Sequence, residues 1–249
     1  MKGMFNFLKR RRRRQLRALP FPEKWSQVLE GLPLYKKISV DDRRELRGHI
    51  QVFLAEKNIE GCGGIEITDQ IRVTIAAQAC LLLLHRHTDY YPDTPSVLVY
   101  PGEYVTPARD PDLESSPRIG EAWPDGKVVL SWDDMRNDIA EDDRYNVVFH
   151  EFAHLLDMES GAADGTPTLA SRDGYSAWGR VLGEEYADLQ SSGARRSSAL
   201  DTYGAEHPAE FFAVATESFF GDPKRLRDRH PELYEELRRY YNQDPASWG

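Results

Sequence analysis

The amino-acid sequence predicts an α+β fold that is mostly helical and contains a small mixed sheet. Two short runs, at 96–100 and 127–132, have the composition of strands, and helical segments lie before and after them. Because strands and helices do not alternate regularly, the pattern disfavours a doubly wound parallel sheet. The 249 residues, 40% of them hydrophobic, suffice for a single core. We therefore predict one folded domain over residues 21–249.

The first half of the chain is predicted to hold two helical regions followed by a strand. Apolar residues recur at helical spacing between 24 and 58, and "EGCGG" at 60–64 is typical of a turn. Thr68 is placed to cap the apolar helix "TDQIRVTIAAQACLLLL". "SVLVY" at 96–100 is typical of a strand and ends at a proline and a glycine.

The second half is predicted to return to helix after one more strand. "KVVLSW" at 127–132 has strand composition and follows the turn signal "PDG". A helix is expected from near Asp143, and the Gly- and Asp-rich stretch at 159–174 is expected to be a loop. The last two of the remaining helices begin with a proline, which suits a first-turn position. These remaining helices are predicted at 175–190, 208–220 and 231–242.

The composition favours a cytoplasmic protein without membrane spans. No apolar run approaches the roughly 18 residues that a membrane span requires. In "MKGMFNFLKRRRRRQLR" the basic block follows the apolar patch, which is the reverse of a secretory signal. Cys62 and Cys80 do not make a disulfide framework, and we expect both thiols to be reduced.

Charge is distributed unevenly along the chain. Residues 1–17 carry eight basic and no acidic side chains, whereas the rest carries 24 basic and 41 acidic ones, a net charge of −17. Such an acidic body disfavours nucleic acid as a direct partner. We expect residues 1–20 to form a basic, solvated and disordered arm, and contact of this arm with anionic lipid is the alternative.

The stretch "VVFHEFAHLLD" at 147–157 is the segment that points to catalysis. On a helix, His150 and His154 share one face and present two imidazoles to one ion. Glu151 lies beside them and completes the H-E-x-x-H pattern of zinc peptidases. Zinc takes neutral imidazole ligands, lowers the pKa of a bound water and polarises the scissile carbonyl. Glu151 is therefore the candidate general base.

The remaining positions of this helix agree with a metal site. Val148, Phe152 and Leu155 form an apolar stripe that would anchor the helix and leave the histidine face toward a cleft. Asp157 either orients a ligand histidine or is an ordinary aspartate at the surface or in the last turn. The alternative to the metal site is a helix whose two histidines are merely packed or solvated.

A catalytic zinc requires a third protein ligand, which must come from further along the chain. In "DTYGAEHPAEFFAVATESFF", Glu210 is the preferred ligand because it heads an amphipathic helix. Glu217 lies two turns later on the same face and is either an orienting partner or a solvated carboxylate. His207 could also bind the ion, but it precedes Pro208 and is explained more simply as part of the helix start. Tyr203 is a candidate donor to the oxyanion of the tetrahedral intermediate.

These segments resemble the Mlc titration factor A family of bacterial zinc peptidases. "HEFAHLLD" and "DTYGAEHPAEFFAVATESFF" carry the resemblance, with "GCGGIEITDQIRVTIAAQACLLLL" and "EAWPDGKVVLSW", and it spans residues 25–222 without the arginine-rich segment. The catalytic core of that family is in turn similar to the anthrax lethal factor peptidase domain. Both belong to the glutamate-third-ligand class of zinc peptidases, the gluzincins.

The resemblance implies a zincin-like fold in which one helix carries the "HEFAH" motif. It implies that His150, His154 and Glu210 bind one catalytic Zn²⁺ ion, with Glu151 as general base and Tyr203 as a catalytic tyrosine. It further implies aminopeptidase-like hydrolysis of small peptides. A glucose-responsive transcriptional repressor of the Mlc type is the implied partner, which would link the protein to sugar uptake.

The strand at 127–132 also gains a candidate role. In zinc peptidases of this general architecture, an edge strand above the active-site helix pairs with the extended substrate through backbone hydrogen bonds. Val128 to Trp132 is the candidate edge strand, and the alternative is an internal strand of the same sheet.

A second function competes with catalysis. The chain could be a regulator-binding, anti-repressor protein whose zinc site is mainly structural. A structural zinc site is closed by four protein ligands, whereas this sequence offers three ligands and a base. The sequence therefore favours a zinc metallopeptidase that acts on a peptide or protein substrate.

Overall fold

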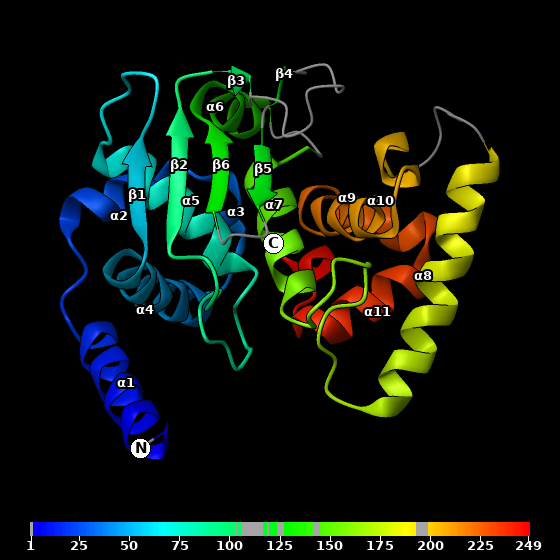
Figure 1. Ribbon diagram of the computed structural model, residues 1–249, viewed down its shortest axis with the longest axis horizontal. Helices are drawn as coiled ribbons and strands as arrows, with labels where there is room; N and C mark the ends of the chain where they lie inside the picture. Colours follow the sequence, from blue (N-terminus) through cyan, green and yellow to red (C-terminus); the bar gives the residue numbers. More distant parts are fainter. Residues whose placement is uncertain are drawn as a thin grey trace.

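A computed structural model of the chain confirms the α+β fold. The four-stranded sheet and its covering helices form one half of the molecule, and a group of helices from the C-terminal part forms the other (Figure 1). Helix α7 (Val147–Met158) runs between the two halves. No helix among the described residues combines the length and apolar character needed to cross a bilayer. The structure describes residues 2–102, 104–105, 117–118, 120–123, 127–141, 145–192 and 199–249.

The sheet has three parallel strands and one antiparallel strand, in the order β1-β2-β6-β5. The predicted strands are confirmed as β2 (Ser96–Tyr100) and β6 (Lys127–Ser131), while the predicted turn at 124–126 lies outside the described residues. The structure adds β1 (Asn58–Gly61) and β5 (Gly120–Trp123), which the sequence did not predict. A separate antiparallel pair is formed by β3 (Tyr104–Val105) and β4 (Pro117–Arg118).

The expectation that Val128 to Trp132 forms an edge strand is wrong. Strand β6 pairs with β2 on one side and β5 on the other, so it is an internal strand, and Trp132 already begins the next helix. Its four positions from Val128 to Ser131 are all buried, as the nearly continuous apolar run of a strand covered on both faces requires. The edge beside β6 belongs to β5.

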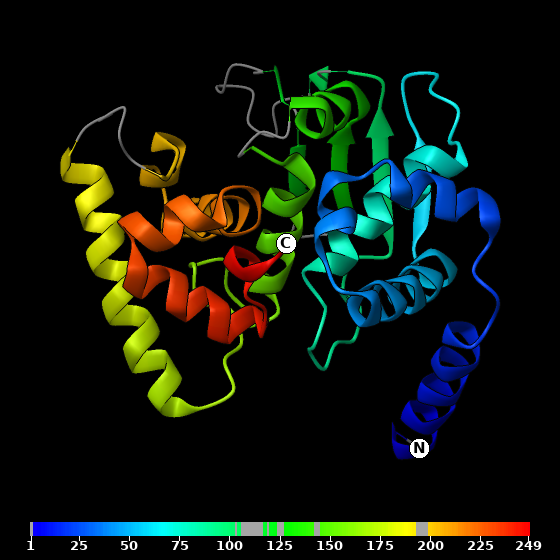
Figure 2. The same ribbon diagram turned by 180° about the vertical axis from the view of Figure 1, so that it is seen from behind.

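The helical region predicted at 24–58 is divided into three helices. These are α2 (Glu23–Glu30), α3 (Pro33–Lys37) and α4 (Val40–Glu56). Proline is the first residue of α3, and Ser39 caps α4 by accepting a hydrogen bond from the Asp42 backbone N–H. A first-turn proline and a serine cap each begin a new helix, so they divide the region although its apolar residues keep helical spacing. Helix α5 (Asp69–Leu81) follows with its predicted Thr68 cap, and the helices from α2 to α5 lie on one face of the sheet (Figure 2).

The expectation of a disordered arm at 1–20 is wrong for its main part, which forms helix α1 (Lys2–Arg17) beside α4. Arg13 is only 8% exposed and forms ion pairs of 2.7 Å to Glu56 and 2.5 Å to Asp89. Its guanidinium also lies 4.6 Å from the centroid of the Tyr90 ring. A basic run is thus only partly solvated, because the acidic body supplies carboxylates that hold one arginine in place.

The C-terminal half is helical, as predicted. The predicted helices are confirmed as α8 (Arg172–Ser192), α9 (Pro208–Gly221) and α11 (Pro231–Tyr241), and both prolines occupy first-turn positions. Asn146 caps α7, so this helix begins four residues later than expected. The elements not predicted are α6 (Trp132–Glu141), α10 (Pro223–Arg229) and the short 3₁₀ helices η1 (Thr202–Ala205) and η2 (Pro245–Ser247).

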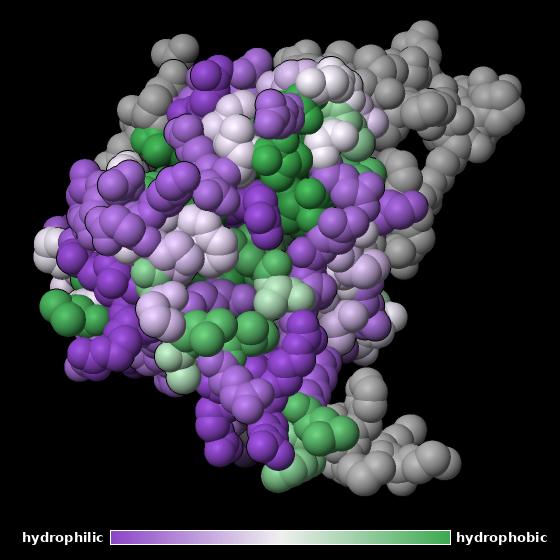
Figure 3. All heavy atoms as spheres, turned by 90° about the vertical axis from the view of Figure 1, so that its left-hand side faces the viewer, coloured by the Kyte–Doolittle hydropathy of each residue, from purple (hydrophilic) through white to green (hydrophobic). Residues whose placement is uncertain are grey.

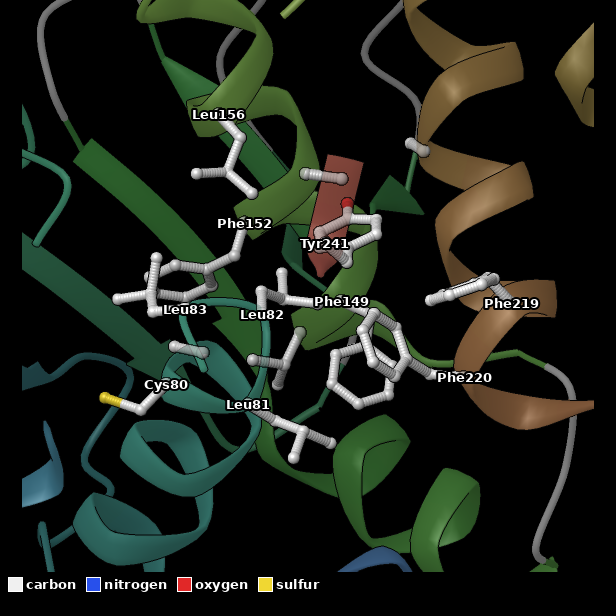
Figure 4. Close-up of a cluster of buried hydrophobic side chains, with 14 of the residues drawn as sticks. Cys80, Leu81, Leu82, Leu83, Phe149, Phe152, Leu156, Phe219, Phe220 and Tyr241 are labelled. Atoms are coloured by element: carbon white, nitrogen blue, oxygen red, sulfur yellow. The ribbon is translucent and has the colours of Figure 1, made fainter. Parts of the chain in front are cut away.

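An aromatic and aliphatic core holds α7 between the two halves (Figure 4). Phe152 packs toward the sheet half, with ring centroids 4.8 Å from Tyr91 and 5.9 Å from Phe53. Phe149 packs against Phe220 of α9 at 5.2 Å. The predicted apolar stripe of α7 is fully part of this core. Burial of these residues fixes the rotation of α7 and hence the direction of its histidines.

Candidate metal centre

Two neighbouring helices bring the three predicted metal ligands together. His150 and His154 lie one turn apart on α7, and Glu210 lies in the first turn of α9. Glu210 Oε2 is 3.0 Å from His150 Nε2 and 3.3 Å from His154 Nε2. The two Nε2 atoms are 3.2 Å apart. Among the described residues, these three form a group with the spacing needed to hold a metal ion.

The donor set and its spacing fit a zinc ion. Nitrogen and oxygen ligands about 2.0–2.1 Å from a tetrahedral zinc ion lie about 3.3 Å from each other. The three observed separations, 3.0, 3.2 and 3.3 Å, are close to that value. Each Nε2 atom has either one proton or one lone pair, so hydrogen bonds cannot satisfy all three contacts at once. A single cation satisfies all three.

Glu217 supports the ligand His150 from the opposite side of its ring. Its side chain is buried, and Oε1 lies 2.7 Å from His150 Nδ1. Oε2 accepts a hydrogen bond of 2.7 Å from the Asn146 backbone N–H at the start of α7. A carboxylate on Nδ1 fixes the tautomer whose Nε2 lone pair points toward the ion. Of the two alternatives for Glu217, the structure shows the orienting position rather than a solvated carboxylate.

Replacing Glu217 with glutamine is expected to weaken zinc binding about 10- to 100-fold, the effect typical of such supporting groups. An amide still fits the site but no longer stabilises the Nδ1–H of His150 with a negative charge. Competition with a chromophoric chelator would measure the affinity. The exposed Glu232 of α11, replaced in the same way, is the control, and equal affinities in both variants would contradict the role of Glu217.

The electrostatics of the site match a centre that holds a cation. Burial lowers the pKa of His150, but hydrogen bonds to Glu210 and Glu217 outweigh burial and raise this pKa well above its usual value. Burial raises the pKa of Glu210, but hydrogen bonds to both histidines reverse this effect and keep the pKa far below normal. The carboxylates thus require positive charge between them, which an ion supplies when the imidazoles are neutral.

Glu151 and Tyr203 lie at the edges of this centre. Glu151 is 5% exposed, and burial is the largest cause that raises its pKa to about 7. A carboxyl group with this pKa can both accept and release a proton near neutral pH. Tyr203, in η1, is 45% exposed, and its ring centroid is 6.0 Å from that of His150. The structure therefore places both predicted catalytic side chains next to the ligand group.

Asp157 and His207 have structural roles and make no hydrogen bond to the three candidate ligands. Asp157 is buried and accepts a hydrogen bond of 2.7 Å from the Gly165 backbone N–H, so the proposed contact with a ligand imidazole is replaced by a contact with the following loop. His207 caps α9 by accepting a hydrogen bond from the Ala209 backbone N–H. This agrees with the expectation that His207 belongs to the helix start.

Gly165 is a residue of the site that the sequence did not single out. Its carbonyl accepts a hydrogen bond of 2.9 Å from Trp178 Nε1, and its backbone has φ +77°. A Cβ atom here would lie 2.4 Å from the carbonyl oxygen of Pro208, the first residue of α9. The loop around Gly165 therefore packs in direct contact with the first turn of α9, which contains Glu210. The only sequence signal was the glycine content of the 159–174 loop.

Substituting Gly165 with alanine is expected to destabilise the fold by about 2–4 kcal/mol, from a strained backbone and the clash with Pro208. Gly161 is a matched control, because it also has a positive φ of +97° but nothing lies within 4 Å of the position that a Cβ atom would take. The Gly161→Ala variant should lose about 1 kcal/mol of unfolding free energy, from backbone strain alone. Urea unfolding measures both, and equal losses would contradict the close packing of the loop on α9.

Comparison with known proteins gives the family. The chain matches the model of the glucose-regulated metallo-peptidase M90 family over residues 7–242, so the similarity is wider than the predicted 25–222 and includes most of α1. An uncharacterized protein of Synechocystis sp. is 39% identical over 244 residues, which is 94% of this chain and 89% of the relative. Mlc titration factor A of Serratia proteamaculans is 31% identical over 90% of this chain and 88% of its own length. The Klebsiella pneumoniae protein of that name is also 31% identical, over 89% and 86%. This chain therefore belongs to the glucose-regulated metallo-peptidase M90 family.

Proposed function

We propose that the protein is a zinc-dependent peptidase of the gluzincin class with a zincin-like catalytic core. The observation that carries the proposal is the convergence of His150 Nε2, His154 Nε2 and Glu210 Oε2 next to the buried carboxyl group of Glu151. Three ligands leave one position of a tetrahedral zinc ion open, as in catalytic rather than structural sites. The similarity of the core to anthrax lethal factor stays a prediction.

Each residue of the centre has a role in this reaction. When bound, a zinc ion supplies Lewis-acid activation of the attacking water and of the scissile carbonyl. Glu151 accepts the proton of the water and passes it to the leaving amine. Tyr203 donates a hydrogen bond to the oxyanion. Glu217 keeps His150 in the tautomer that binds the ion, as its contact of 2.7 Å to Nδ1 supports.

An extended substrate has an available pairing partner in β5. This strand is the sheet edge beside α7, and its residues Gly120–Trp123 contact that helix. Among the described residues no strand pairs with the other side of β5, so an extended peptide could be added there through backbone hydrogen bonds. Such pairing requires an extended segment and tolerates many side chains. Strand β5 therefore takes the role that the sequence suggested for β6.

Hydrolysis of a panel of aminoacyl and short-peptide chromogenic substrates tests the proposal. Matched peptides with free and acetylated N-termini separate aminopeptidase-like cleavage from internal cleavage. Activity that depends on added zinc and disappears with a chelator is the expected result. Complete lack of zinc-dependent cleavage across free, blocked and protein substrates would overturn the assignment as a peptidase.

A second function is supported by the relatives named Mlc titration factor A, a name that points to the Mlc repressor. We propose that this chain binds a repressor of the same type and thereby affects sugar uptake. Pull-down of such a repressor by the Glu151→Gln variant would separate binding from cleavage. Binding without any peptidase activity in the wild-type protein would favour the anti-repressor with a mainly structural zinc site.

We place both functions in the cytoplasm. The two cysteines support this location, because Cys62 and the fully buried Cys80 are free thiols. Reduced thiols are usual where glutathione and thioredoxin act. Fractionation of cells that express the protein would test the location, and a periplasmic or secreted pool would contradict it.

A further inference from the structure

Helix α1 exposes two large apolar side chains in its N-terminal half. Phe7 is 64% exposed and Leu8 is 54% exposed, and the two are neighbours on the helix. Contiguous exposed apolar side chains that are rimmed by polar residues are typical of a contact surface. In Figure 1 the N-terminal end of α1 projects away from the sheet and from the other helices.

The arginines of α1 divide into two groups. Arg13 is buried and neutralised by two carboxylates, so it attaches the helix to the body. Arg10, Arg11 and Arg14 are exposed, and within the described part of the chain none of them has an ion-pair partner. These three guanidinium groups are therefore available for an anionic partner, while α1 itself stays fixed.

A basic cavity adjoins the same helix. It has a volume of about 700 Å³ and lies between α1 and the 86–90 segment. The positively charged residues along it outnumber Glu45 and Asp89, the two acidic ones. Its basic lining consists of Lys9, Arg10, Arg13, Arg14, Arg17 and Arg86. This volume is sufficient for a phosphate-bearing headgroup.

We propose that α1 docks the protein on an anionic lipid surface, with Phe7 and Leu8 in the interface and Arg10, Arg11 and Arg14 on the lipid phosphates. On helix α1, Arg10, Arg11 and Arg14 follow Phe7 by three, four and seven positions, so they lie on the same side of the helix as Phe7. A lipid surface that takes up the Phe7 side chain therefore also meets these three guanidinium groups.

Charge complementarity selects this partner. The chain outside residues 1–17 has a net charge of −17, so an anionic surface repels the body and attracts only the region around α1. The face of the molecule in Figure 3 is mainly hydrophilic and is interrupted by a few apolar patches. Nucleic acid would use the arginines but leave Phe7 and Leu8 in water, whereas a bilayer uses both.

Co-sedimentation of the full chain with vesicles tests the proposal. Binding is expected to vesicles with about one-third phosphatidylserine or phosphatidylglycerol and to be weak with pure phosphatidylcholine. The Arg10→Gln, Arg11→Gln, Arg14→Gln variant should bind about 100-fold more weakly, since each arginine near such a surface contributes about fivefold. Failure of the wild-type protein to bind anionic vesicles, or equal binding to neutral ones, would overturn the proposal.

Two further variants distinguish a lipid from other anionic partners. Phe7→Ser with Leu8→Ser keeps every charge and should weaken vesicle binding about tenfold or more. If this variant bound vesicles as the wild type does, a purely electrostatic contact would replace the proposed insertion. The control removes three exposed charges from α10, on the opposite side of the molecule in Figure 1, and should not change binding. It carries Lys224→Gln, Arg227→Gln and Arg229→Gln.

Discussion

Replacing Glu151 with glutamine is expected to lower kcat about 10²- to 10⁴-fold on any peptide that the wild-type protein cleaves. The substitution keeps the shape of the side chain and removes the carboxylate that is the proposed proton acceptor. Because Glu151 lies beside the ligand atoms without being one of them, the variant should bind as much zinc as the wild type. Steady-state kinetics and metal analysis on the same preparation give both results.

Glu159 provides the matched control, since it lies at the C-terminal end of the same helix and accepts the same substitution. The Glu159→Gln variant should retain wild-type kcat and zinc content. If Glu151→Gln kept its activity with a full complement of zinc, another group would be the base and the proposed mechanism would be wrong. If the variant lost zinc instead, Glu151 would belong to the ligand set.

Replacing Glu210 with alanine is expected to abolish activity by a different route, through loss of the ion. The carboxylate is the one ligand that α9 supplies, and only two imidazoles from α7 would remain. Zinc affinity should fall by more than the roughly 10- to 100-fold expected for supporting groups such as Glu217. Chelator competition and peptide hydrolysis over a range of zinc concentrations would measure both losses.

Glu206 is the control for this experiment. It is exposed and lies four residues before Glu210, just outside α9. The Glu206→Ala variant should bind zinc and cleave peptides like the wild type. Restoration of activity in Glu210→Ala by excess zinc would identify the defect as weakened binding, whereas unchanged zinc affinity would remove Glu210 from the ligand set.

The parts of the site that depend on local geometry could be predicted from the sequence. His150 and His154 share a helix face because α-helical periodicity brings residues four apart onto one side. Glu210 lies 60 residues after His150, yet its place in the first turn of an amphipathic helix after a proline made it the best candidate. The apolar stripe of α7 likewise follows from its spacing alone.

The parts that depend on contacts between distant segments could not be predicted. Strand β6 became internal only because β5, which has little strand character in its sequence, pairs with it. From its spacing, Asp157 was a candidate to hydrogen-bond a ligand histidine. Instead, its carboxylate accepts a hydrogen bond from the Gly165 N–H in the following loop. Arg13 similarly finds Glu56 and Asp89, more than 40 positions away in the sequence.

The ion pairs of Arg13 attach α1 to the rest of the protein. If α1 docks on a membrane as proposed, they determine how freely the rest of the protein can move. A disordered arm would be a flexible linker of variable end-to-end distance, and the body could rotate freely relative to the membrane. A helix attached to the body by two ion pairs would instead fix the orientation of the body and its distance from the membrane surface. With α1 docked as proposed, the metal centre would reach only peptide segments at that distance from the membrane, so distance from the surface would become a criterion of substrate choice.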